Sequence, residues 1–184
     1  VVPEEYAARV LNIKAWQPFM VSQLFSIRNG KGITKEEIES NPGTFIAVQS
    51  GEENNGCMGL IDKEYCLQMR YTLTDLPCLT VARSGSAGYV SYQQKGCVVG
   101  DSAKILLLKN ERANNPYVLL FLKTVLMANK YKFTYGRKVT EQNYMSEIIR
   151  LPAISENGHI TPDWQYMENY MKSLPYSDKL TLRR

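Results

Sequence analysis

The sequence predicts an α+β domain in which a twisted, mostly antiparallel sheet is flanked by helices. Between residues 44 and 109, short apolar and β-branched runs alternate with turns that contain Gly, Asn or Pro. Other segments have apolar residues at helical spacing. The 184 residues are 44% hydrophobic and 22% charged. These values are typical of one globular domain and exclude a disordered, collagen-like or coiled-coil chain.

The N-terminal part is expected to contain two short helices separated by an apolar block. Residues 4–12 can form the first helix, and the apolar block at residues 16–27 ends at a turn, residues 29–32. Thr34 can cap the second helix, and Glu37 can complete its capping box.

Six short runs after this point have the composition of strands and are bounded by turn residues. They are residues 44–48, 57–61, 78–82, 88–92, 97–99 and 104–108. We expect these runs to form one curled, mostly antiparallel sheet.

Three more helical segments are predicted from caps and apolar stripes. Asn115 can cap a helix with Pro116 at its first position, and Thr140 can cap a short helix that extends to Ile148. The last helix has one apolar side, formed by Trp164, Met167, Met171 and Leu174. Because this side needs a partner surface, the helix is expected either to cover its own domain or to begin a connector. We therefore divide the chain into a domain, residues 1–160, and a C-terminal helical segment, residues 161–184.

The net charge of +4 is distributed unevenly along the chain. Residues 76–139 contain ten basic and two acidic residues, whereas the remainder contains twelve basic and sixteen acidic residues. A basic middle between acidic flanks is typical of a surface that meets a polyanion, because phosphates attract Lys and Arg regardless of sequence. A solvated surface on a slightly basic protein explains the same distribution.

The sequence favours neither a metal or redox centre nor a membrane anchor. Cys57, Cys66, Cys78 and Cys97 include no close Cys-x-x-Cys pair, and His159 is the only histidine. We therefore expect buried free thiols, and neither metal ligands nor catalytic residues nor a cofactor in this chain. The apolar runs are shorter than a membrane span and the first residues are acidic, so we expect a cytoplasmic protein.

Candidate DNA contacts lie mainly in two segments of the basic middle. The turn at residues 83–88 is rich in small residues and carries side chains that can reach phosphates or base edges. Residues 130–138 alternate cations with aromatic residues, as a strand with one basic and one apolar face would. The candidates are Arg83, Ser84, Ser86, Lys95, Lys130, Lys132, Arg137 and Lys138, with Asn54, Asn55, Gln68 and Arg70 as weaker choices for base readout. The alternatives are a glycine-rich hairpin with an incidental arginine, and aromatic residues that serve the core.

Two further classes of function remain open. Asp163, Glu168 and Lys172 are the residue types of a metal-dependent nuclease or small hydrolase, in which carboxylates hold a divalent metal and a lysine assists water. Their spacing on a helix instead fits an exposed ion pair between Glu168 and Lys172. The apolar side of the same helix could also dock on a partner protein.

Several short motifs occur in a characteristic order along nearly the whole chain. They are the apolar run from Trp16 to Phe25, Gly32-Ile33-Thr34, Pro42-Gly43, Asn54-Asn55-Gly56-Cys57-Met58-Gly59, Thr80 to Gly88, Val99-Gly100-Asp101, Tyr135-Gly136-Arg137 and Ile149-Arg150-Leu151-Pro152. Together they resemble a target recognition domain, found in the specificity subunits of type I restriction-modification systems and in related bifunctional type II enzymes. The closing motifs, Pro162-Asp163-Trp164 and Met167-Glu168, look most like the type II branch.

The resemblance implies a non-catalytic module whose loops read one part of a DNA site in the major groove. Helices that follow the module would set the distance to a second recognition domain, so this chain would be one part of a larger protein. Methyltransferase and endonuclease domains or subunits would carry out methylation and cleavage, using S-adenosylmethionine and Mg²⁺. Double-stranded DNA, those domains and a second recognition domain are therefore the expected partners. Base-reading residues vary across the family, so no individual contact is carried over.

Overall fold

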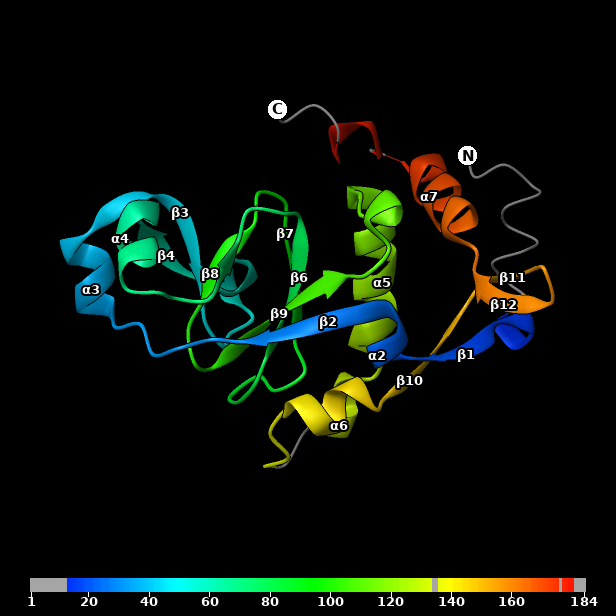
Figure 1. The fold of residues 1–184 in the computed structure, drawn as a ribbon, viewed down its shortest axis with the longest axis horizontal. Helices are drawn as coiled ribbons and strands as arrows, with labels where there is room; N and C mark the ends of the chain where they lie inside the picture. The colour runs from blue at the N-terminus through cyan, green and yellow to red at the C-terminus, as the bar shows by residue number, and fades with distance from the viewer. Residues whose placement is uncertain (1–12, 134–135, 176, 181–184) are drawn as a thin grey trace.

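The computed structural model describes residues 13–133, 136–175 and 177–180. Two four-stranded sheets lie beside each other; the longer helices and two short two-stranded ribbons are packed at one end, and two short helices lie at the other (Figure 1). The helix expected at residues 4–12 lies outside the described residues. No helix in the described part of the chain is both long and apolar enough to cross a membrane.

The first sheet forms the centre of the molecule. Its strands are β2 (Phe25–Asn29), β9 (Ala103–Leu108), β6 (Cys78–Ala82) and β7 (Val90–Gln93), in that order, and every pair is antiparallel. Strands β6 and β9 are buried along their whole length, which explains why nearly all of their residues are apolar.

The second sheet has the order β4 (Cys57–Ile61), β3 (Pro42–Val48), β8 (Cys97–Val99) and β5 (Leu73–Thr74). Strands β3 and β8 are parallel, and the other pairs are antiparallel. The mostly antiparallel α+β class is thus confirmed, but the expectation of one sheet is wrong. A tight turn, in which the Ala103 amide donates to the Gly100 carbonyl oxygen at 3.2 Å, directs β8 and β9 into different sheets.

Two short helices cover the second sheet at the far end of the molecule, α3 (Lys35–Ser40) and α4 (Lys63–Gln68). The capping box of α3 is confirmed, since the Glu37 amide donates to the Thr34 hydroxyl at 3.1 Å and the Thr34 amide donates to the Glu37 carboxylate at 2.8 Å. Helix α4 and strand β5 were not expected from the sequence. The Asp62 carboxylate caps α4 by accepting the Tyr65 amide.

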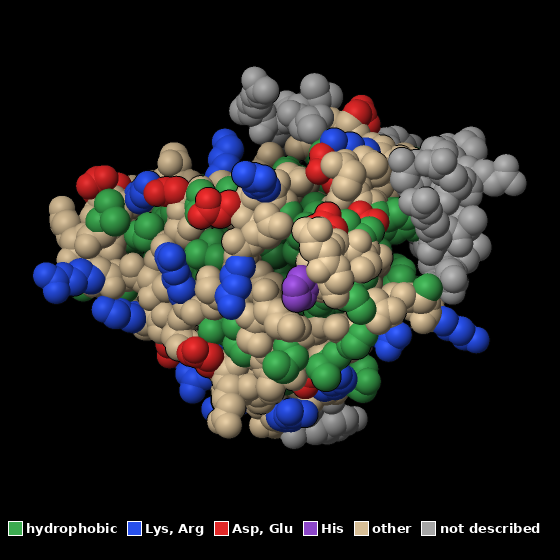
Figure 2. All heavy atoms as spheres, turned by 45° about the vertical axis from the view of Figure 1, so that its right-hand side comes forward, with side chains coloured by type: hydrophobic (Ala, Val, Ile, Leu, Met, Phe, Trp, Pro, Cys, Tyr) green, Lys and Arg blue, Asp and Glu red, His purple; other side chains and the backbone are tan. Residues whose placement is uncertain are grey.

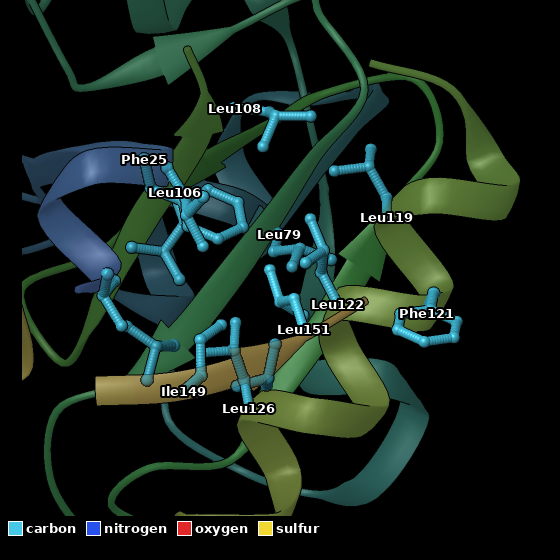
Figure 3. Packing of buried hydrophobic residues seen from close by; sticks show 14 of the residues in the cluster. Phe25, Leu79, Leu106, Leu108, Leu119, Phe121, Leu122, Leu126, Ile149 and Leu151 are labelled. Atoms are coloured by element: carbon cyan, nitrogen blue, oxygen red, sulfur yellow. The ribbon is translucent and has the colours of Figure 1, made fainter. Parts of the chain in front are cut away.

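Helix α5 (Pro116–Ala128) packs across the first sheet and forms the main core with it (Figure 3). The predicted cap is confirmed, because the Asn115 side chain accepts the Val118 amide at 3.1 Å. Leu119 and Leu122 point towards the sheet, where they meet side chains of its strands. Phe121 points the other way and packs against Trp16 and Tyr170.

The segment after α5 contains a helix that is shorter than expected, followed by a strand that was not expected. Helix α6 (Glu141–Met145) has the predicted Thr140 cap but does not reach Ile148. Ile148 instead begins β10 (Ile148–Leu151), which pairs with β1 (Gln17–Met20). One turn of helix, α2 (Val21–Leu24), joins β1 to β2.

The C-terminal part is a hairpin followed by a helix. Strands β11 (Ala153–Glu156) and β12 (His159–Pro162) are joined by Asn157 and Gly158, both with positive φ, as a two-residue hairpin turn requires. Helix α7 (Trp164–Ser173) then packs against α5. Met167 is fully buried in the main core, so this helix covers its own domain.

Candidate nucleic-acid interface

Three segments that are far apart in sequence meet at one end of the β6–β7 hairpin. They are the β3–β4 loop, residues 49–56, the β6–β7 loop, residues 83–89, and the described residues after α5, 130–133 and 136–139. We call the surface between them the loop groove. The Val139 amide donates to the Arg83 carbonyl oxygen at 2.9 Å. Gly88 has a φ of +84° and lies so close to the Phe133 ring that a Cβ would approach it to 3.0 Å. The packing therefore fixes the ends of two of the segments together.

The loop groove contains two adjoining hollows. The smaller, of about 300 Å³, brings together five of the predicted DNA-contacting residues, Ser84, Ser86, Lys130, Arg137 and Lys138. The larger, of about 730 Å³, is lined by the β3–β4 loop, including Asn54. Glu52 and Ser86 line both hollows, so they mark the boundary between them.

Hydrogen bonds connect the β3–β4 loop to neighbouring strands and turns. Gln49 donates to the Ile33 carbonyl oxygen at 3.3 Å, and Ser102 donates to the Gln49 side chain. Asn55 donates to the Tyr92 carbonyl oxygen at 2.7 Å, and its own carbonyl oxygen accepts from Gln93 at 3.1 Å. These contacts place the loop on the rigid part of the fold, as a precise recognition surface requires.

Lys130 and Glu52 form an ion pair across the loop groove. A hydrogen bond from the Lys130 ammonium group, followed by its positive charge, lowers the pKa of the Glu52 carboxyl. Ser86 adds a smaller hydrogen-bond contribution in the same direction. The pair thus joins the β3–β4 loop to the segment after α5.

Several cations of the basic middle already have protein partners. Lys132 forms an ion pair with Glu147 at 2.6 Å, and the Arg137 guanidinium lies 5.4 Å from the centre of the Phe133 ring. Glu52 and Glu147 come from the acidic flanks of the sequence, so the flanks neutralise part of the basic middle. On the face shown in Figure 2, Lys and Arg side chains are spread out and do not form one patch.

Residues 130–138 do not form the strand that was expected. Residues Lys130–Phe133 are a 3₁₀ turn, and Phe133 is buried in the main core whereas Tyr131 is 69% exposed. Tyr135 lies outside the described residues. The alternating cations and aromatic residues therefore lie in a turn, and Phe133 attaches that turn to the core.

Other predicted contact residues lie outside the loop groove. Lys95 lies in the turn after β7, at the opposite end of the β6–β7 hairpin from the 83–89 loop. Gln68 is the last residue of α4, which covers the second sheet, and Arg70 follows the helix with a positive φ of 53°. Arg83 lies beside the loop groove and donates to the Asp101 carbonyl oxygen at 3.4 Å, and the Asn55 side chain is used to hold its loop. These placements leave the assignment of each residue to DNA contact as a prediction.

Sequence reasoning missed the environments of two charged residues, Glu52 and Lys104. From the sequence, Glu52 was counted only among the acidic residues that flank the basic middle. It lies in a turn between Gly51 and Gly56, and its side chain lines the loop groove. Lys104 is only 7% exposed and donates to the Asn29 side chain at 2.5 Å. Burial lowers the pKa of Lys104, and the nearby Arg83 charge adds to this effect. The sequence around Lys104 predicted an apolar strand, but it did not indicate that the lysine itself would be buried.

The acidic residues of α7 have structural roles. Asp163 caps the helix by accepting the Tyr166 amide at 2.9 Å, and Glu168 pairs with Lys172 at 2.5 Å as expected from their spacing. Across the described ranges, no group of three His, Cys, Asp or Glu side chains could hold a metal ion. The nuclease alternative thus has no support in this geometry.

Comparison with known proteins identifies the family of this chain. Residues 13–174 match the family model of the type I restriction modification DNA specificity domain. The chain belongs to this family. It is a DNA-recognition module of a restriction-modification system and not a catalytic domain.

Individual relatives are specificity subunits. The chain is 32% identical over 163 residues to the Type II restriction enzyme BgcI specificity subunit S.BcgI of Heyndrickxia coagulans, covering 89% of this chain and 44% of the relative. A putative type I specificity subunit of Mycoplasma pneumoniae is 28% identical over 108 residues, covering 58% of this chain and 28% of the relative. These relatives are thus more than twice as long as the part that this chain matches.

Solved structures show the same fold. The S subunit of a type I restriction-modification system from M. genitalium superposes with a TM-score of 0.66 at 13% identity, covering 97% of this chain and 46% of that one. The HsdS subunit from Thermoanaerobacter tengcongensis gives a TM-score of 0.56 at 11% identity, covering 97% and 44%. The chain again spans less than half of each relative.

Proposed function

We propose that this chain reads one part of a two-part DNA site and that the loop groove is its contact surface. The observation that carries this proposal is the convergence of Lys130, Arg137 and Lys138 with Ser84 and Ser86 around one hollow. Cations supply the affinity for phosphates, and hydroxyl groups can donate to phosphates or base edges.

The rest of the site would be read by a second recognition domain. In support, the chain spans 44% of the specificity subunit to which it is 32% identical. In this proposal residues 161–184 begin the connector between the two domains, with α7 seated on the first. The assembly would act in the cytoplasm, where it meets the cell's DNA.

Methylation and cleavage would be carried out by methyltransferase and endonuclease domains or subunits that bind S-adenosylmethionine and Mg²⁺. The described residues of this chain include no group of three His, Cys, Asp or Glu side chains placed to hold a metal ion. The role of this chain would be to place those domains at the correct sequence.

The electrostatic part of the proposal is tested by a matched pair of lysine variants. Lys138 and Lys95 are both exposed, but only Lys138 lines the loop groove. Replacing Lys138 by Gln removes one phosphate contact, so it should weaken binding to every duplex and reduce the slope of log K against log salt by about 0.9. Lys95→Gln makes the same change in net charge at the other end of the hairpin and should leave the slope unchanged. Fluorescence anisotropy with a labelled duplex at several salt concentrations measures both.

Lys130 and Lys132 differ in a way that extends this test. Both have acidic partners, but only Lys130 lines the groove. Lys130→Gln should therefore weaken binding more than Lys132→Gln, and the double variant should weaken it across all sequences. Equal slopes for Lys138→Gln, Lys95→Gln and the unmodified chain would place the DNA surface elsewhere.

Sequence recognition itself is tested by selection from a library of random duplexes with the purified chain at two salt concentrations. We expect one enriched, asymmetric motif at both concentrations, because base contacts survive salt better than phosphate contacts do. A lack of any enriched motif would contradict the proposed function.

A further inference from the structure

Glu52 is an acidic side chain in the smaller hollow, whose other polar side chains are cations and hydroxyls. Its carboxylate is paired with Lys130, and Arg137 and Lys138 line the same hollow. The Glu52 side chain is 49% exposed and that of Lys130 is 29% exposed. The carboxylate therefore faces solvent at the point where the two hollows of the loop groove join.

A carboxylate in this position opposes phosphate binding. A phosphate that contacted Lys130 without displacing its partner would lie beside a second negative charge, and like charges repel. The carboxylate is compatible with a bound duplex where it accepts a hydrogen bond from a base. In the major groove, the carboxylate side chains of Glu and Asp accept from the N4 amino group of cytosine.

We propose that Glu52 is a specificity-determining residue that accepts a hydrogen bond from the N4 amino group of a cytosine, while Lys130 exchanges Glu52 for a DNA phosphate. This inference rests on the proposed function. It adds a base-reading role for an acidic residue to a surface whose cations, Lys130, Arg137 and Lys138, would bind phosphates.

The surroundings of Glu52 favour this role over that of a mobile surface charge. The Gln49 and Asn55 contacts fix both ends of its loop, and Gly85 of the facing loop lies against Ser50. Lys130 and Ser86 restrain the carboxylate before DNA arrives. A side chain that is positioned in advance loses little conformational entropy on binding, and it discriminates between bases more sharply.

The competing role is a simple tie between two loops. A tie would make the removal of Glu52 weaken binding to all duplexes in the same proportion, with no change in base preference. A base-reading Glu52 predicts the opposite pattern, in which preference at one base pair changes and the other positions of the motif do not.

The neighbouring Glu53 provides the matched control. It lines the larger hollow but not the smaller one, and its replacement by Gln makes the same change in net charge one residue away. The experiment is selection from a random duplex library with the purified unmodified chain, Glu52→Gln, Glu52→Ala and Glu53→Gln. Thermal unfolding of each variant checks that the fold is retained, as the exposure of both side chains leads us to expect.

Glu52→Gln should change the preference at one base pair from cytosine to adenine, because Gln bonds the N6 and N7 atoms of adenine. The loss of discrimination for cytosine at that pair should be about tenfold. Glu52→Ala should lose the preference without gaining another, and Glu53→Gln should leave the motif unchanged.

Three results would overturn the inference. An unmodified chain that enriches a motif, together with a Glu52→Gln variant that enriches the same motif at every position, would reject the role of Glu52 and leave the proposed function standing. An unmodified chain that enriches no motif would reject both. A change of motif in Glu53→Gln equal to that in Glu52→Gln would show a general charge effect and would also reject the inference.

Discussion

Replacement of Met167 by Ala tests whether α7 is an integral part of the domain. Met167 is fully buried in the main core, among side chains of α5 and the first sheet. Truncation of a fully buried Met to Ala removes three heavy atoms and leaves a cavity, and such changes cost about 2–5 kcal/mol. We expect a loss of about 3 kcal/mol in the free energy of unfolding.

Met171 on the same helix is the matched control. It is only partly buried, where it lines an apolar hollow with Trp16 and Tyr170. Because part of its surface already meets water, Met171→Ala should cost about 1 kcal/mol. Urea denaturation followed by circular dichroism gives both values, and an unchanged slope against urea shows that the folded state is equally compact. A cost for Met167→Ala below that for Met171→Ala would refute the packing of α7 on this domain.

Two further substitutions probe polar groups. Hydrogen bonds from Tyr71, followed by those from the backbone and from Tyr65, lower the pKa of Glu37, so its contribution to stability is present above the usual carboxyl pKa of 4.5 and is lost as the pH falls through the lowered value. Glu37→Gln leaves an acceptor for the Thr34 amide, as a capping box allows, but replaces the charged acceptor of the Tyr71 and Tyr65 hydroxyls by a neutral one. It should therefore cost about 1 kcal/mol at pH 7, and the difference in urea midpoint from the unmodified chain should shrink in acid. Tyr144 is buried, and its hydroxyl has no hydrogen-bond partner among the described residues. Tyr144→Phe should therefore leave stability unchanged or raise it by up to about 1 kcal/mol, measured by thermal unfolding, whereas a large loss would reveal a partner for the hydroxyl.

The sequence predicted the local elements better than their arrangement. Capping signals are local, so Thr34, Asn115 and Thr140 marked the starts of three helices correctly. The strand at residues 57–61 was also predicted with its observed ends. Pairing depends on residues far apart in the chain, and composition alone did not show that β8 joins β3 in a second sheet.

The same limit applies to the loop groove. Arginine, lysine and serine in turns were recognised as DNA-contacting types, and five of the predicted residues line one hollow. Lys95 had the same composition signal, but the direction of the β6–β7 hairpin places it at the other end. Glu52 was missed because an acidic residue carries no signal for DNA binding until its contact with Lys130 is seen.

The division of labour within residues 130–139 suggests how the recognition surface can change while the fold is kept. Phe133 and Val139 are buried in the main core and attach this part of the chain to it. Lys138 and Arg137 between them are exposed and belong to no core cluster. Substitution of exposed residues outside such packing usually changes stability by less than about 0.5 kcal/mol. The charge and hydrogen-bonding groups of the loop groove can therefore be altered almost independently of the core, which is the property that a module needs if its DNA sequence preference is to change without loss of its structure.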